Sequence, residues 1–312
     1  MTPISIVMDC DPGHDDAIAI MLALASPELE LVGITTVYGN QTLDKTTANA
    51  VRVLDVVDRS DVPVHAGVDR PLVRELFVAD YVHGESGLDG PRLPPPSRSP
   101  GDLHAVDYLA REIRRRDGRL TLVPTGPLTN IALLLALAPD ARPERIVLMG
   151  GAIGEGNRTP AAEFNIWCDP EAAAMVFEAG FRKITLVPLD ATHRALVTRE
   201  DCRRLAALGT PAATATAKFT HHRIDIHDQI QRMDSPGSAP VHDALCVASL
   251  IEPSVISTRK LHVAVETTGA LTVGRTVIDT HSRSLSAPNC DVAFDADPRR
   301  FMDLLLDTFA PR

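Results

Sequence analysis

The sequence lacks closely spaced cysteines, a signal-peptide pattern and any apolar run long enough to cross a membrane. Its five cysteines are dispersed, and an odd, dispersed set argues for reduced thiols and against a zinc site or a disulfide framework. No basic region precedes the apolar run at the N-terminus, so we expect no signal peptide. Apolar runs such as residues 131–138 are too short to span a bilayer. We therefore expect a cytoplasmic protein that does not enter the membrane.

Positive charge is also scarce. Lys and Arg total 31 against 41 Asp and Glu, which gives a formal net charge of -10. This balance argues against nucleic acid or an anionic membrane as a partner, because counterion release needs clustered Lys and Arg. Two nucleotide-binding motifs are missing as well. No GxxxxGK(S/T) occurs, and the glycines at 154 and 156 lack the third Gly of GxGxxG.

The sequence does contain an alternation of β-rich and helical segments. Residues 29–37 and 62–66 have strand patterns on either side of a helical pattern at residues 46–58. This order predicts an α/β fold with an open, mostly parallel sheet and flanking helices. Residues 261–266 and 271–279 predict a hairpin, which would be a small antiparallel appendage. Because no linker or internal repeat is visible, we expect a single domain over residues 1–312.

Residues 74–100 are less regular than their surroundings and become proline-rich from residue 91. A long irregular segment inside a compact domain is often functional. We interpret it as a surface flap near a site, with a plain linker as the alternative.

Four carboxylates, Asp9, Asp11, Asp15 and Asp16, lie between two apolar segments near the N-terminus. The pattern predicts a buried strand before them and a helix after them. Aspartate is common as a helix N-cap, but capping explains only one or two of the four. Like charges this close repel unless a cation joins them, and oxygen ligands favour Ca²⁺ or Mg²⁺. The stretch therefore predicts a divalent-metal site.

Other polar residues follow the predicted strands, where an α/β sheet binds its ligands. They are carboxylates, amides, a threonine and one histidine, without Lys or Arg. A phosphate site would favour Lys, Arg or a helix N-terminus. The set indicates a polyhydroxylated, sugar-like ligand around a hard cation.

Eight motifs resemble, in order along the chain, those of the inosine–uridine-preferring nucleoside hydrolases. They occupy residues 9–17, 36–41, 83–87, 124–130, 147–151, 155–157, 162–165 and 241–243. The resemblance implies the Rossmann-like fold of that family. It also implies Ca²⁺-dependent hydrolysis of the N-glycosidic bond of a small-molecule nucleoside substrate, which yields base and ribose.

The resemblance also implies roles for individual residues. Asp11, Asp16, Asp243 and the backbone carbonyl of Thr125 are expected to hold Ca²⁺. Asp11 is expected to act as the general base on water. The residues expected to bind the substrate are Asp15, Asn40, His83, Met149, Asn157, Glu163, Phe164, Asn165 and His242.

The leaving base needs a proton or a strong hydrogen bond, and His242 is the expected acid. Its neighbour Asp243 is expected to raise its pKa, which would suit a proton donor. Relatives usually carry aromatic residues on the preceding helix, but residues 218–230 contain no Tyr. His222 is a candidate relay, with a solvent-facing histidine as the alternative, and Asp234 is a candidate base-facing residue. We hypothesise an altered base preference, with purine and pyrimidine ribonucleosides both open.

Two rival functions fit parts of the pattern. A haloacid-dehalogenase-like phosphatase also has a strand-end DxD motif around Mg²⁺. Here Pro12 and Gly13 follow Asp11, and no suitable lysine appears. A Ca²⁺-dependent nucleoside-binding protein without turnover is the second rival, and the presence of Asp11 and His242 argues against it. The family likeness also implies a homo-oligomer, either a dimer or a tetramer.

Overall fold

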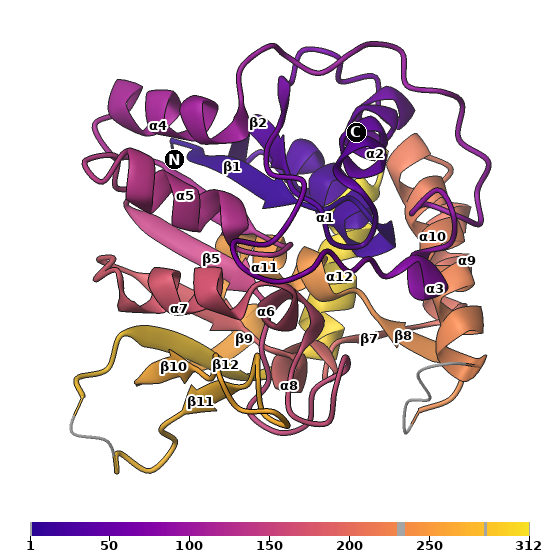
Figure 1. Cartoon of the computed structure of the whole chain (residues 1–312). Coiled ribbons are helices and arrows are strands. Elements are labelled where there is room, and N and C mark those ends of the chain that lie inside the picture. The colour runs from indigo at the N-terminus through magenta and orange to yellow at the C-terminus, as the bar shows by residue number, and fades with distance from the viewer. Residues whose placement is uncertain (1, 230–234, 284–285, 312) are drawn as a thin grey trace.

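The computed structural model describes residues 2–229, 235–283 and 286–311, and its centre is an eight-stranded sheet (Figure 1). Its strands are β1 (Ile4–Cys10), β2 (Leu29–Thr36), β3 (Val64–Ala66), β4 (Thr121–Pro124), β5 (Arg145–Met149), β6 (Ile184–Val187), β9 (Ile256–Leu261) and β12 (Cys290–Ala296). They lie in the order β3-β2-β1-β4-β5-β6-β12-β9. Every neighbouring pair is parallel except β9 and β12. The predicted open, mostly parallel sheet is confirmed.

Two small antiparallel sheets lie beside the main one. In the first, β10 (Val263–Val265) pairs with β11 (Thr276–Ile278), which confirms the predicted hairpin over a shorter length. In the second, β7 (Leu196–Thr198) pairs with β8 (Ser238–Pro240). Strand β9 was not predicted, because its middle residues are exposed and carry polar and charged side chains. Such a composition is typical of an edge strand.

Helices cover both faces of the sheet. They are α1 (His14–Ala25), α2 (Leu43–Val56), α3 (Asp80–His83), α4 (Ala105–Arg115), α5 (Thr129–Leu137), α6 (Phe164–Cys168), α7 (Pro170–Glu178), α8 (Leu189–Thr192), α9 (Arg199–Ala207), α10 (Pro211–Gln229), α11 (His242–Ile251) and α12 (Pro298–Phe309). A short 3₁₀ turn, Pro253–Val255, precedes β9. Among the helices of the described residues, none combines the length and apolar character that a membrane crossing requires.

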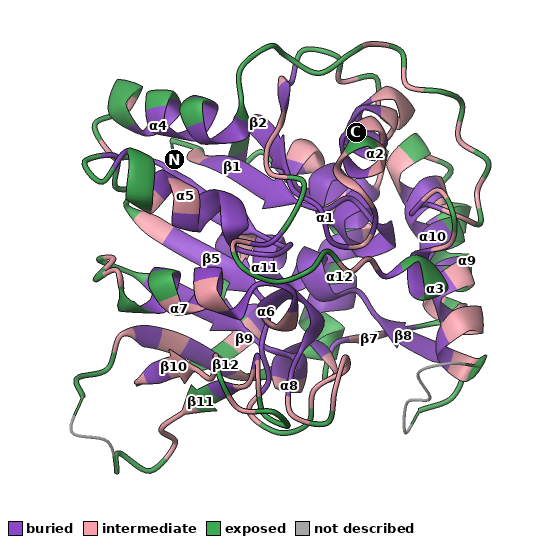
Figure 2. Cartoon of the chain, in the orientation of Figure 1, coloured by how far each residue is buried: buried purple, intermediate pink, exposed green. Residues whose placement is uncertain are grey.

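Two apolar clusters hold the layers together. Residues of α1, α11 and α12 form the cluster on one face, and residues of α4, α5 and α7 form the other (Figure 1). Along β1, Ile6 and Met8 join the first cluster while Val7 joins the second, since successive strand side chains point to opposite faces. The central strands are therefore buried on both sides, as Figure 2 shows. Only their ends are left to carry polar groups.

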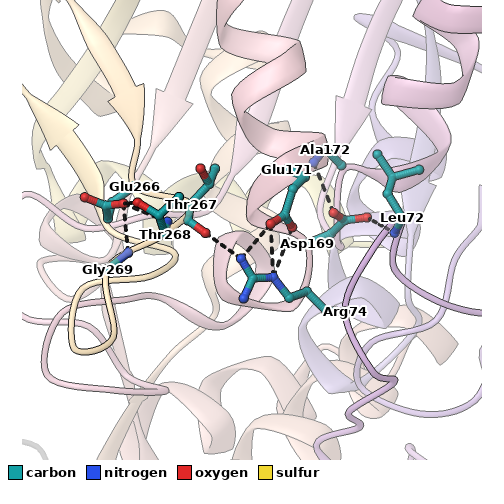
Figure 3. Close-up of polar contacts among 9 residues, drawn as sticks. All are labelled: Leu72, Arg74, Asp169, Glu171, Ala172, Glu266, Thr267, Thr268 and Gly269. Atoms are coloured by element: carbon teal, nitrogen blue, oxygen red, sulfur yellow. Dashed lines mark hydrogen bonds and ion pairs between the residues drawn. The ribbon is translucent and has the colours of Figure 1, made fainter.

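The irregular segment between β3 and α4 is fastened to α7 and to the β10–β11 hairpin (Figure 3). The buried Asp169 accepts the Leu72 N–H at 2.9 Å and the Ala172 N–H at 3.0 Å. Arg74 binds the Glu171 carboxylate and the Thr267 carbonyl, both at 2.5 Å. These contacts fix the start of the segment, which continues into α3.

Candidate active site

A pocket lies beside the carboxyl ends of the strands and is lined in part by α3, α6, α10 and α11. It brings together most of the residues that the sequence predicted for substrate and metal. Those in its lining are Asp15, Asn40, His83, Thr125, Met149, Asn157, Glu163, Phe164, Asn165, His242 and Asp243. Asp11 and Asp16 are fully buried and contact residues of that lining. The predicted flap takes part, because α3 supplies Tyr81, Val82 and His83.

The acidic stretch is a strand-to-helix turn, as predicted, and Asp16 joins its parts. Its Oδ2 accepts the Gly13 N–H at 3.0 Å, which satisfies a free backbone donor in the first turn of α1. The Thr125 hydroxyl donates to Oδ1 at 2.7 Å, and the Asn40 amide donates to Oδ2 at 3.2 Å. Asp16 therefore caps a helix and also links the turns after β1, β2 and β4.

Asp11 has one satisfied and one unsatisfied oxygen. Its Oδ2 accepts the Asn40 backbone N–H at 2.7 Å, while its Oδ1 is buried and has no hydrogen-bond partner. Glycine allows this close packing, because a Cβ on Gly126 would lie 2.7 Å from Oδ1. A buried carboxylate oxygen without a donor is unfavourable unless a ligand completes it.

The buried carboxylates repel one another, and burial adds to the cost of charging them. Burial raises the pKa of Asp243 well above its usual range, and the charges of Asp16, Asp15 and Asp11 raise it further. Burial, with the charge of Asp16 added, likewise raises the pKa of Asp11 well above its usual range. Burial also raises the pKa of Asp16 to about 6, although hydrogen bonds from Gly13 and Thr125 oppose the shift. A bound cation would remove this mutual repulsion.

The donor set therefore fits a hard divalent cation in its chemistry. Within the described ranges, no three His, Cys, Asp or Glu side chains stand close enough together to hold an ion as they are. The orphaned Oδ1 of Asp11 and the raised pKa values of Asp11 and Asp243 are nevertheless what a cation would relieve. Thr125 differs from the three aspartates, because its expected ligand atom is a backbone carbonyl oxygen. That oxygen already accepts a hydrogen bond from the Asn165 side-chain amide at 2.8 Å.

A second wall of the pocket is built around the start of α6. Glu163 precedes this helix, and its two oxygens accept the backbone N–H groups of Gly151, Asn165 and Ile166 at 2.8 to 3.1 Å. Burial raises the pKa of Glu163 to about 7 despite these donors. The Asn165 amide donates to the Met149 carbonyl at 3.3 Å, and Asn157 accepts the Phe164 N–H at 2.9 Å. The wall is therefore held rigid by its own hydrogen bonds.

The histidines behave differently from the prediction. Burial lowers the pKa of His242 well below its usual range, and the neighbouring His193 and Arg223 add to the effect. The expectation that Asp243 raises this pKa was wrong: the pKa falls, because burial removes water from the imidazolium. The ring of His242 is positioned by Thr192, whose hydroxyl lies 2.7 Å from Nδ1. His83 stacks on His14 at 5.2 Å, and burial also lowers its pKa.

Sequence reasoning missed Arg223 and Tyr81. Arg223 lines the pocket from α10, only 4% exposed, and Tyr81 lines it from α3. Arg223 lies within residues 218–230, the stretch that contains no Tyr, and its charge in a half-buried helix is the signal that the sequence offers. The aromatic rings near the pocket come from other segments than residues 218–230. The ring centroid of Phe77 lies 6.4 Å from that of Phe164 and 6.3 Å from that of Tyr81.

Two further candidates, Asp9 and His222, are not among the described residues that line the pocket. Asp9 is fully buried, and its Oδ1 accepts Thr35 and Asn130 at 2.6 and 2.8 Å, which ties β1 to its surroundings. His222 contacts the ring of His14 at 5.3 Å. Asp234 lies outside the described residues.

The chain is similar to known proteins over nearly its whole length. Residues 6–303 match the family described as inosine-uridine preferring nucleoside hydrolase. The chain is 50% identical over 307 residues to the pyrimidine-specific ribonucleoside hydrolase RihA of Shewanella sp. (strain MR-7), with 98% of this chain and 96% of that one covered. It is 47% identical over 304 residues to the RihA of Escherichia coli O9:H4 (strain HS), with 97% of each chain covered.

Solved structures are also similar. The purine-preferring ribonucleoside hydrolase from Gardnerella vaginalis superposes with a TM-score of 0.90 at 32% identity, covering 98% of each chain. The plant nucleoside hydrolase PpNRh1 gives a TM-score of 0.91 at 32% identity, covering 99% of this chain and 100% of that one.

Proposed function

The chain belongs to the inosine-uridine preferring nucleoside hydrolase family and is a ribonucleoside hydrolase, and we propose that it cleaves pyrimidine ribonucleosides with a bound Ca²⁺. The observation that carries the proposal is the unsatisfied Oδ1 of Asp11, buried beside Asp16 and Asp243 under a pocket rich in carboxylates and amides. Such a site needs a cation and offers many partners to a sugar.

Asp11, Asp16, Asp243 and the Thr125 carbonyl would hold the ion. All four are hard oxygen donors, which Ca²⁺ prefers, and Ca²⁺ also tolerates irregular geometry. When bound, the cation would supply a lowered pKa for water and contacts for the ribose hydroxyls.

Asp11 would take the proton from the attacking water, and its Oδ1, which has no other donor, supports this role. The water oxygen forms a bond to the anomeric carbon as the bond from that carbon to the base nitrogen breaks. The sugar passes through a state with oxocarbenium character. The carboxylates and amide oxygens that face the pocket would stabilise this positive charge.

Ribose binding is assigned to the two polar walls. Asp15 keeps a buried Oδ1 with no partner, so it can accept a hydroxyl directly. Asn40, Asn157, Asn165, Glu163, His83 and the Met149 carbonyl would complete the sugar site, with Phe164 against its edge. His242 would contact the leaving base as a neutral imidazole, in keeping with its lowered pKa.

The base preference is inferred from relatives. Those at 47–50% identity are named pyrimidine-specific, whereas the Gardnerella structure, at 32% identity, is named purine-preferring. We assign pyrimidine preference because the more similar sequences share it.

A substrate panel with and without a chelator tests the proposal. Uridine and cytidine should release ribose at least tenfold faster than inosine and adenosine, measured as reducing sugar. A chelator should abolish release, and added Ca²⁺ should restore it. Comparable turnover of all four nucleosides would reject the pyrimidine assignment, and full activity in chelator would reject the metal site.

A further inference from the structure

Arg223 is an unusual residue for this pocket. Among the described residues that line it, Arg223 carries the permanent positive charge, while Asp15, Glu163 and Asp243 are acidic. A guanidinium is costly to bury, and a buried one is normally paired and fully hydrogen-bonded.

The guanidinium is only partly satisfied. Its Nη2 lies 3.4 Å from Asp15 Oδ2, which is long for a charge-assisted hydrogen bond. Its Nε and Nη1 are buried and have no hydrogen-bond partner. The side chain is 4% exposed, so solvent does not replace the missing partners. Two donors, on different edges of the guanidinium, are therefore open to an acceptor from a ligand.

The position of Arg223 indicates which part of the ligand would supply this acceptor. The carboxylates and amides of the pocket are taken up by the cation and the sugar. The lining residues without such a role are Ala79, Tyr81, Val82, Arg223 and His242, which come from α10, α11, α3 and the residue before α3. The base must lie against this remaining surface. Arg223 is its permanently charged member, next to Asp15 and hence next to the ribose.

We propose that Arg223 binds the oxo group beside the glycosidic nitrogen of a pyrimidine and stabilises the electron pair that the base carries away. This inference rests on the proposed nucleoside hydrolysis. As the bond from C1′ to N1 breaks, its electron pair passes to the base and spreads onto the 2-oxo oxygen. The water oxygen takes the vacated bond at C1′ and gives one proton to Asp11, and the released base gains one proton in turn.

The geometry of the side chain suits this role. A guanidinium is planar, carries several N–H donors and keeps its charge at any physiological pH, so one free donor can reach an oxo group. Cytosine and uracil both carry the 2-oxo group, whereas a purine has no exocyclic oxygen beside its glycosidic nitrogen. Arg223 thus gives this pocket a reason to prefer pyrimidines.

A simpler role must be separated from this one. Arg223 could act only by offsetting the acidic charge of Asp15 and Asp243, whose pKa values it lowers. Loss of that structural role would harm every substrate to the same degree, whatever the leaving group. Loss of leaving-group stabilisation would harm poor leaving groups most.

The test compares Arg223→Met and Arg223→Lys with the wild-type enzyme on uridine, 5-fluorouridine and p-nitrophenyl riboside. These leaving groups become progressively better, so they need progressively less stabilisation. Removing a preorganised donor of this kind reduces kcat by about 100-fold or more. We expect that loss of kcat/KM on uridine for Arg223→Met, a smaller loss on 5-fluorouridine, and less than about fivefold on p-nitrophenyl riboside. Arg223→Lys should recover part of the loss, because it keeps the charge but not the planar guanidinium.

The matched control is Arg199→Met. Arg199 of α9 pairs with Asp225 and Asp228 of α10, the helix that carries Arg223, at 2.7 and 3.2 Å. Arg199 does not line the pocket, so the activity of the Arg199→Met variant should stay within twofold of wild type. Thermal midpoints of all variants check folding, and Arg223→Lys carries the comparison if Arg223→Met does not fold. Equal losses on the three substrates would overturn the inference while leaving the hydrolase assignment intact. A wild-type enzyme inactive on all three would instead overturn the proposed function, and this inference with it.

Discussion

The two ends of the pocket are built in different ways. The end proposed to bind the cation and ribose is made from turns that directly follow buried strands, such as Asp11 after β1 and Thr125 after β4. The base end comes from α10, α11 and α3. At the first end the side chains directly follow strands of the sheet, so strand pairing sets their positions. The second depends on how helices and a long segment pack over that sheet.

The ends also differ in charge. At the first end, burial and neighbouring carboxylate charges raise the pKa values of Asp11 and Asp243, a conflict that the proposed cation would relieve. At the second, Arg223 supplies a charge that needs no metal. In the proposed mechanism, chemistry common to all nucleosides is thus concentrated at one end, and discrimination between bases at the other.

The largest expected effect comes from the first end. Asp11→Asn should lower kcat by about 1,000-fold or more on every nucleoside, because a general base contributes about 10² to 10⁴ in rate and the cation loses a ligand. Steady-state kinetics and calorimetric titration with Ca²⁺ check both effects. Asp61→Asn is the control, since its exposed pair with Arg59 lies outside the pocket lining. Loss confined to one base type would contradict the division between the ends.

A mutation at the second end should be selective. Tyr81 lines the pocket and is 44% exposed, so its ring is placed to cover the base rather than to react with it. Tyr81→Ala should raise KM for uridine by about tenfold with kcat little changed, as expected for loss of a base–aromatic contact of about 1–3 kcal/mol. Tyr81→Phe is the matched variant and should stay near the wild-type value. A fall in kcat at constant KM would assign Tyr81 to the chemistry instead.

The smallest effect should come from the support of the second end. Arg74 ties the segment before α3 to Glu171 and Thr267 (Figure 3). Arg74→Met should raise KM by about threefold, since a partly exposed ion pair contributes roughly 0.2–1 kcal/mol. Amide hydrogen exchange over residues 72–83 should become faster. Arg70→Met is the control, because Arg70 pairs only with its neighbour Asp69 at the surface. Unchanged exchange would show that Asp169 alone holds the segment.

The sequence predicted the first end well because its residues are local to strand ends. Asp11, Asp15 and Asp16 follow one apolar strand, and Asn40 follows the next, so parallel pairing alone brings them together. The pKa of His242 was mispredicted from its neighbour Asp243, because burial depends on packing that adjacency does not reveal. Glu163 accepts hydrogen bonds from the backbone N–H groups of Asn165 and Ile166 at the start of α6. The sequence did not predict α6, so it did not reveal this capping role.

By itself, the sequence determined the α/β fold, the family and the acidic turn, because each rests on short-range patterns of apolar and polar residues. Only the tertiary structure decided that Arg223 enters the pocket, that Tyr81 lines it in addition to the expected Phe164, and that Asp9 stays outside it. A position on α10 can face the core, the solvent or the ligand, and its choice follows from how the helix packs. The packing of α10 depends on its contacts with α1 and α9. These are separate elements, so no local sequence pattern around Arg223 records the contacts.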